Sequence, residues 1–162
     1  MSKIAGIYWD DTAAAPGISL SVYFSGCHFH CPGCHNPEAW DFDYGEEFTE
    51  EKLYEILTKL RKNGVCRKLS ILGGEPLCDE NLYDVGALIS KVKIKYPDTK
   101  IYLWTGYTYE ELLERKERAD GILQSILDTI DVLIDGRYDE TKRDTTLPLR
   151  GSSNQRIIKL KG

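Results

Sequence analysis

Apolar residues recur along the chain in short segments that alternate between strand-like and helix-like spacing. Residues 18–24 are rich in β-branched and aromatic side chains and predict the first strand. Further short apolar segments predict strands over residues 68–72, 100–104, 130–134 and 156–160. Residues 1–17 show little periodicity and end in an Ala-Ala-Ala-Pro-Gly segment, which predicts a loop.

Between these strands, apolar residues repeat at the three- and four-residue spacing of amphipathic helices. Thr49 is the expected N-cap of the first helix, with acidic residues following it where the helix dipole favours them. A second helix is expected from Glu80 to Lys95. Thr108 and Glu111 match a capping box, which opens a third helix that Gly121 divides into two pieces.

This strand–helix alternation predicts an α/β fold with a mostly parallel sheet and right-handed crossovers. The 162 residues are expected to form a single domain, 1–162, because the chain is long enough for one core but not two. Four or five strands are too few to close an eight-stranded barrel, so we expect an open partial (β/α) barrel.

Four polar or glycine-rich motifs each follow a predicted strand. In parallel sheets, ligands bind outside the carboxyl ends of the strands, so these motifs should meet at one edge. The motifs are a cysteine-rich loop at residues 26–37, Gly73-Gly74-Glu75, Thr105-Gly106-Tyr107 and Asp135-Gly136. Their convergence predicts a single active site.

The cysteine-rich loop holds three cysteines in a C-x₃-C-x₂-C arrangement: Cys27, Cys31 and Cys34. Thiolates are soft ligands that suit zinc or iron–sulfur clusters. With no obvious fourth ligand, a [4Fe–4S] cluster here would keep one iron free of protein thiolate. The alternative is a structural Cys₃His zinc site, because every histidine of the chain lies in this loop: His28, His30 and His35.

The three-cysteine spacing resembles the signature of radical S-adenosylmethionine enzymes. More narrowly, the chain resembles the activating proteins of anaerobic ribonucleoside-triphosphate reductases, a family of glycyl radical enzyme activases. The blocks that carry this resemblance keep the family's order almost end to end: residues 26–37, 73–76, 104–107, 131–136 and 150–155. The chain departs from the family at Ser19, where many members carry an arginine, so any role of that arginine is absent or supplied elsewhere.

The resemblance implies a [4Fe–4S] cluster held by Cys27, Cys31 and Cys34, with S-adenosylmethionine chelating the open iron. It further implies cleavage of this cofactor to a 5′-deoxyadenosyl radical, which makes a glycyl radical on the anaerobic reductase. A flavodoxin-like protein would supply the electron. No catalytic side chain is implied beyond the cluster and the cofactor, whose binding residues would be Gly33, Cys34, His35, Gly73, Gly74 and Glu75.

Two rival functions remain open at this stage. One is activation of another glycyl radical enzyme, such as pyruvate formate-lyase; the other, of a different class, is a non-catalytic zinc-binding module. Cys66 and Cys78 lie outside the cluster motif and are expected to behave as small apolar residues, although a redox or ligand role for Cys78 stays open. The chemistry of the segment from Arg150 to Gln155 is also open.

Composition and charge indicate where the protein is expected to work, but they say little about its function. The net charge of −5 gives no argument for nucleic-acid binding, which normally needs a basic face. The N-terminal residues show no secretory signal, and no apolar stretch is long enough to cross a bilayer, so no membrane partner is expected. Five cysteines, an odd number, favour a reducing cytoplasm over a disulfide framework.

Overall fold

A seven-stranded sheet in the order β3-β1-β2-β4-β5-β6-β7 organises the computed structural model, which describes residues 1–116 and 121–161. Its strands are β1 (Lys3–Asp11), β2 (Ser19–Phe24), β3 (Glu46–Glu47), β4 (Lys68–Gly73), β5 (Ile101–Trp104), β6 (Val132–Asp135) and β7 (Arg156–Lys159). The central strands β2, β4, β5 and β6 are parallel. Strands β1, β3 and β7 pair antiparallel at the edges. The mixed α/β class is confirmed, but the expected four or five strands were too few.

Strand β1 corrects the prediction of a loop over residues 1–17. It runs antiparallel to β2, with register shifts between Ile4 and Gly6 and again between Tyr8 and Asp11. Of its residues only Ile4 is fully buried, while the Tyr8 side chain is 61% exposed. The strand therefore lacks a regular apolar–polar alternation. It is stabilised by hydrogen bonds to β2, and the local sequence pattern does not reveal that pairing.

The helices begin where their capping residues predict. They are α1 (Glu50–Leu60), α2 (Asp79–Lys95), α3 (Tyr109–Lys116) and α4 (Ile122–Thr129), with short 3₁₀ turns at Pro37–Trp40, Lys62–Gly64 and Glu140–Lys142. Thr49 caps α1 by accepting a hydrogen bond from the Lys52 amide at 3.2 Å. Thr108 and Glu111 bond each other's amides at 2.8 and 3.1 Å, which confirms the capping box. Gly121 stands at the N-cap of α4, which confirms that it opens a separate piece.

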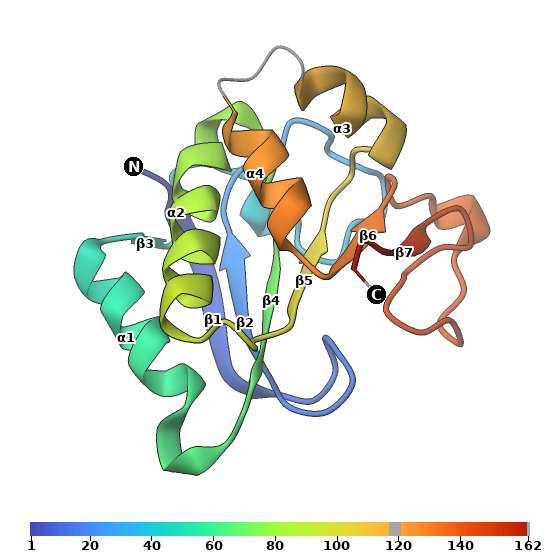
Figure 1. Ribbon diagram of the computed structural model, residues 1–162. Coiled ribbons are helices and arrows are strands. Elements are labelled where there is room, and N and C mark those ends of the chain that lie inside the picture. The colour runs from blue at the N-terminus through green and yellow to red at the C-terminus, as the bar shows by residue number, and fades with distance from the viewer. Residues whose placement is uncertain (117–120, 162) are drawn as a thin grey trace.

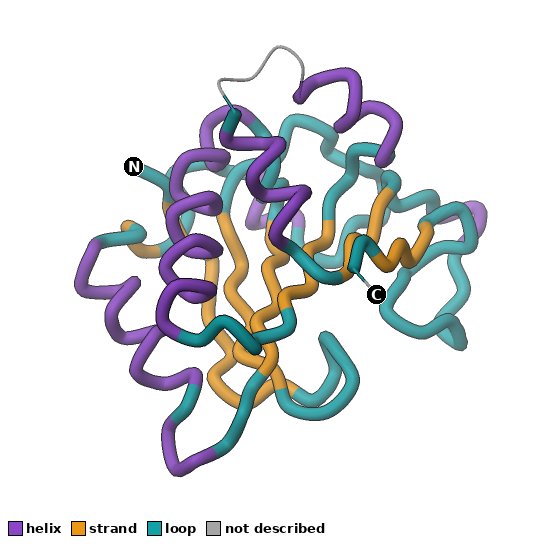
Figure 2. Tube along the Cα trace, viewed as in Figure 1, coloured by secondary structure: helices purple, strands orange, loops and turns teal. Residues whose placement is uncertain are grey.

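Helices α1, α2 and α4 lie on one face of the sheet (Figures 1 and 2). Alternate residues of the parallel strands point into this layer, and the buried core includes Leu20, Val22, Phe24, Leu69, Ile71, Ile101, Leu103 and Leu133. The intervening residues Tyr23, Leu72 and Trp104 line a cavity instead. One face of the central sheet is therefore packed by helices, and the other carries the cavity.

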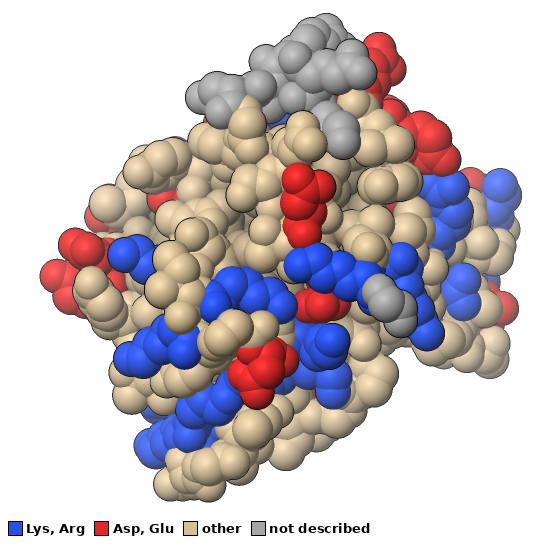
Figure 3. All heavy atoms as spheres, viewed as in Figure 1, with Lys and Arg blue, Asp and Glu red and all other residues tan. Residues whose placement is uncertain are grey.

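Charged side chains are unevenly spread over the helix-covered face (Figure 3). Lysine and arginine gather toward its lower half, with acidic groups among them. Lys93 and Lys100, for example, lie 3.2 and 3.8 Å from the Asp131 carboxylate. In the described part of the chain, no helix combines the length and apolar character needed to cross a membrane.

Candidate functional site

The three cysteines of the loop line one cavity of about 870 Å³ at the carboxyl end of β2. Cys27 is buried, Cys31 and Cys34 are partly buried, and all three are free thiols. The loop can turn here because Gly26 has a φ of +103°. A Cβ at Gly26 would lie 1.9 Å from the Phe42 ring, so a side chain is excluded at this position.

Two of the three thiols, Cys27 and Cys31, lie in surroundings that raise their pKa. Burial raises the pKa of Cys27, although backbone hydrogen bonds from Phe29 and His30 oppose that rise. Burial also raises the pKa of Cys31. Because metal ligands must be thiolates, loading a metal centre here would release protons.

Two of the three loop histidines, His28 and His30, contact side chains outside the cysteine set, while His35 lines the cavity. His28 Nε2 lies 2.7 Å from the Glu80 carboxylate, and His30 stacks on Trp40 with ring centres 4.6 Å apart. Among residues 1–116 and 121–161, no three His, Cys, Asp or Glu side chains converge closely enough for a single metal ion. A tetrahedral Cys₃His zinc site needs such convergence, whereas a cluster takes each thiolate on a separate iron. The donor set therefore fits the cluster better than zinc.

The Gly73-Gly74 turn packs directly against the backbone of the cysteine loop. A Cβ at Gly73 would lie 2.0 Å from the Phe24 carbonyl oxygen, and one at Gly74 would lie 2.5 Å from that of Gly26. The Glu75 amide donates to the same Gly26 carbonyl at 2.7 Å. These contacts require glycine at both positions and lock the two motifs together.

The Glu75 side chain joins the turns that follow β4 and β5. Its Oε2 accepts hydrogen bonds from the Leu77 amide at 2.9 Å and Thr105 Oγ1 at 2.7 Å, and its Oε1 accepts from the Gly106 amide at 2.6 Å. Burial outweighs these donors and raises the pKa of Glu75 to about 7. Glu75 lines the cavity but is only 1% exposed, so it has a framework role that the sequence did not predict.

The other two motifs reach the same edge, although two of their residues, Tyr107 and Asp135, do not line the cavity. The Thr105 amide donates to the Ile134 carbonyl at 2.9 Å, and the Gly136 amide donates to the Tyr107 carbonyl at 3.1 Å. Thr105, Gly106 and Gly136 all line the cavity. Asp135 does not, because its buried carboxylate accepts from the Tyr109 amide and pairs with Arg156.

The two residues that flank Cys34 differ in their placement. His35 lines the cavity and packs on the Tyr138 ring, with ring centres 5.4 Å apart. Gly33 does not line it; its φ is +76°, and a Cβ there would lie 2.5 Å from the Glu140 carboxylate. A cofactor contact by Gly33 or His35 stays a prediction.

Of the remaining residues singled out by sequence, Arg150, Gly151 and Gln155 line the cavity, whereas Cys66, Cys78 and Ser19 lie away from it. Cys66 is exposed, and Cys78 is 1% exposed with its pKa raised to about 12 by burial. Ser19 is buried in β2, where its hydroxyl lies 2.5 Å from that of Ser70. Cys66, Cys78 and Ser19 therefore have no contact with the cavity.

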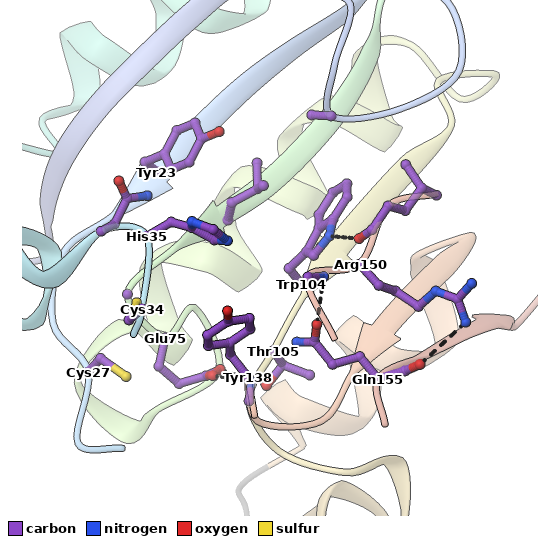
Figure 4. A pocket seen from close by; sticks show the side chains of 18 of the residues that line it. Tyr23, Cys27, Cys34, His35, Glu75, Trp104, Thr105, Tyr138, Arg150 and Gln155 are labelled. Atoms are coloured by element: carbon purple, nitrogen blue, oxygen red, sulfur yellow. Dashed lines mark hydrogen bonds between the residues drawn. The ribbon is translucent and has the colours of Figure 1, made fainter. Parts of the chain in front are cut away.

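Aromatic side chains form much of the cavity wall, which sequence analysis did not foresee. Figure 4 shows Tyr23, Trp104 and Tyr138 around a space that Cys27 and Cys34 border from another side. Tyr23 and Trp104 alternate with core residues along their strands, and this alternation was the only available signal. The Trp104 indole donates to the Leu149 carbonyl at 2.8 Å and so ties the C-terminal segment to this wall.

Comparison with known proteins places the chain in a family with an iron–sulfur cluster. Residues 13–158 match the family described as "4Fe-4S single cluster domain". The chain is 38% identical to the anaerobic ribonucleoside-triphosphate reductase-activating protein of Vibrio cholerae serotype O1, over 91% of each chain. It is 32% identical to the protein of that name from Escherichia coli strain K12, over 93% of this chain and 94% of the relative. It is 34% identical to the protein of the same name from Enterobacteria phage T4, over 93% of this chain and 90% of the relative. The chain therefore belongs to the family of anaerobic ribonucleoside-triphosphate reductase-activating proteins and contains a 4Fe-4S single cluster domain.

Proposed function

We propose that the protein cleaves S-adenosylmethionine reductively at a [4Fe–4S] cluster and generates a glycyl radical on the anaerobic ribonucleoside-triphosphate reductase. The observation that carries this proposal is that Cys27, Cys31 and Cys34 border the same cavity as Gly73, Gly74 and Glu75. Three thiolates leave one iron of a cluster open, and the neighbouring turn offers backbone carbonyl oxygens to an ammonium group. The relatives' names favour the anaerobic reductase over pyruvate formate-lyase as the partner.

In this mechanism the protein supplies binding and geometry. When bound, the cluster would pass one electron to S-adenosylmethionine, giving methionine and a 5′-deoxyadenosyl radical that takes a hydrogen atom from the partner's glycine. Gly73 and Gly74 would present backbone carbonyls to the ammonium of the methionine moiety, and the buried Glu75 would hold this turn in position. His35 would lie beside the adenine, and the aromatic wall of Tyr23, Trp104 and Tyr138 would exclude water.

The partner is expected to close the cavity from its open side. The cavity extends from the cysteines along the helix-free face of the sheet to Asp11, Thr12, Ala13 and Ala14. The seven strands would then act as an open partial (β/α) barrel formed by one domain, 1–162. A flavodoxin-like protein of a reducing cytoplasm would deliver the electron.

The experiment follows the hydrogen atom. Anaerobically reduced protein, S-adenosylmethionine and the anaerobic reductase are mixed, with the reductase deuterated at its glycines. An organic radical should form on the reductase, and deuterium should appear in 5′-deoxyadenosine. Cleavage without the reductase should be slow. Consumption of a small metabolite with no label transfer would refute the protein-substrate proposal.

Cysteine variants provide the matched control for this experiment. Cys31→Ala should abolish radical formation, because it removes a ligand that borders the cavity. Cys66→Ala should leave radical formation unchanged, because Cys66 is exposed and lies outside the cavity.

A further inference from the structure

Arg150 is the only lysine or arginine among the described residues that line the cavity. Three acidic residues share this lining: Asp10, Asp11 and Glu75. Figure 4 shows the Arg150 side chain beyond Trp104, on the side away from Cys27 and Cys34. An anion bound to Arg150 would therefore lie apart from the proposed cluster.

The backbone on both sides of Arg150 is held by side chains. The Trp104 indole donates to the Leu149 carbonyl at 2.8 Å, and Leu149 has a φ of +61°, which residues other than glycine rarely adopt. On the other side, the Gly151 amide donates to Gln155 Oε1 at 2.9 Å. These contacts maintain the unfavourable conformation of Leu149 and fix the direction in which the Arg150 side chain leaves the chain.

The Arg150 guanidinium has donors to spare. Its Nε donates to the Pro148 carbonyl at 3.2 Å, and its Nη1 lies 3.5 Å from the Gln155 carbonyl oxygen. A guanidinium has five N–H donors, of which these contacts use two, so three are left. No carboxylate of the described residues forms an ion pair with it; the Asp144 carboxylate accepts from the Thr146 amide at 2.9 Å instead. A half-buried cation with free donors is suited to an anion from outside the chain.

Two further cations lie beside the Arg150 turn. The Ser153 amide donates to the Lys142 carbonyl at 2.9 Å, and Arg143 pairs with Ser152 in an antiparallel bridge. Lys142 and Arg143 are exposed, and neither forms an ion pair with a carboxylate in the described part of the chain. These two residues and Arg150 form a basic rim on a chain whose net charge is −5.

The basic rim fits a protein segment better than a small molecule. The planar guanidinium matches a carboxylate, which it can bind through two parallel hydrogen bonds. A small cofactor in the cavity could reach Arg150, but Lys142 and Arg143 are not lining residues. An extended polypeptide with acidic side chains can contact all three cations.

We propose that the basic rim of Lys142, Arg143 and Arg150 binds an acidic segment of the partner reductase, with one Asp or Glu carboxylate held by the Arg150 guanidinium in the cavity. The inference rests on the proposed function, from which it takes the partner. It adds the charge of the partner's segment and the residues that select it. The exposed Lys142 and Arg143 would speed association, and the half-buried Arg150 would slow dissociation.

The test measures binding of the cluster-loaded protein to the anaerobic reductase by anaerobic biolayer interferometry, at low and at high salt. Arg150→Gln should raise the dissociation constant about tenfold, the cost of a hydrogen bond between charged groups, mainly through faster dissociation. Arg150→Lys should restore part of the affinity, because it keeps the charge without the planar fork. A separate titration with S-adenosylmethionine alone should give the same affinity for the wild type and Arg150→Gln.

The exposed cations provide a second variant that does not depend on the Arg150 turn. Combined Lys142→Gln and Arg143→Gln should weaken reductase binding about two- to fivefold at low salt and reduce its salt dependence. Arg61→Gln is the matched control. Arg61 also lies 3.4 and 3.5 Å from backbone carbonyl oxygens, but it is not a lining residue, so its replacement should leave reductase binding unchanged.

Each outcome separates the inference from the proposed function. Equal reductase affinity in the wild type, Arg150→Gln and the double variant would overturn the inference, even if the reductase still acquires its radical. A loss of S-adenosylmethionine affinity in Arg150→Gln with reductase binding intact would identify the methionine carboxylate as the ligand, and would overturn it too. Salt-dependent binding through the basic rim without cofactor cleavage would refute only the proposed function.

Discussion

The buried carboxyl group of Glu75 makes the stability of this protein depend on pH in an unusual direction. Its pKa rises from an ordinary 4.5 to about 7 in the folded state, chiefly because burial disfavours the anion. A raised carboxyl pKa means that the folded state binds the proton more tightly than the unfolded state. The contribution of Glu75 is therefore fully present below pH 4.5 and is lost as the pH rises through 7.

The magnitude follows from the same two values. The rise from 4.5 to about 7 corresponds to about 3 kcal/mol at 1.36 kcal/mol per pH unit. Glu75→Gln stays neutral at every pH and serves as the reference. The free energy of unfolding of the wild type, minus that of Glu75→Gln, should fall by about 3 kcal/mol between pH 4.5 and 8.

The assay is urea unfolding of the iron-free, thiol-reduced protein, followed by tryptophan fluorescence at several pH values. Glu75→Ala should lose about 2 to 5 kcal/mol, because the buried amides of Leu77 and Gly106 lose their acceptor. A difference between wild type and Glu75→Gln that is independent of pH would refute the reasoning. In cluster-loaded protein, Glu75→Gln should weaken S-adenosylmethionine binding without altering the cluster absorbance.

Two further predictions concern the cysteine loop and the turn after β5 that packs against it. Replacing Cys27, Cys31 or Cys34 by alanine should abolish iron retention. Cys66→Ala and Cys78→Ala should leave the iron content unchanged. Iron content is measured after anaerobic reconstitution. Full iron in a single loop variant would contradict the ligand assignment. Gly106→Ala should cost about 1–3 kcal/mol by overpacking, because its Cβ would stand 2.6 Å from the Phe29 ring. Thermal unfolding checks this against Gly6→Ala, where no atom lies within 4 Å, and equal losses would contradict it.

The sequence alone determined what depends on near neighbours. The N-cap at Thr49 and the capping box of Thr108 and Glu111 are local hydrogen-bond patterns, so their helices begin where expected. The parallel order of the central strands followed from strand–helix alternation. The family could be inferred from short motifs that keep their order along the chain, residues 26–37, 73–76, 104–107, 131–136 and 150–155. The ligand role of the three loop cysteines stays a prediction.

Only the tertiary structure decided what depends on residues far apart in the chain. Strand β1 is stabilised by hydrogen bonds to β2, and its own sequence of apolar and polar residues does not predict a strand. Glu75 looked like an exposed cofactor ligand, but Thr105 and Gly106, thirty and thirty-one residues away, bind both of its oxygens. The Asn154 amide reaches the carbonyl of a residue seventeen positions earlier. Such contacts are set by how strands and loops pack at one edge of the sheet, and no local periodicity encodes them.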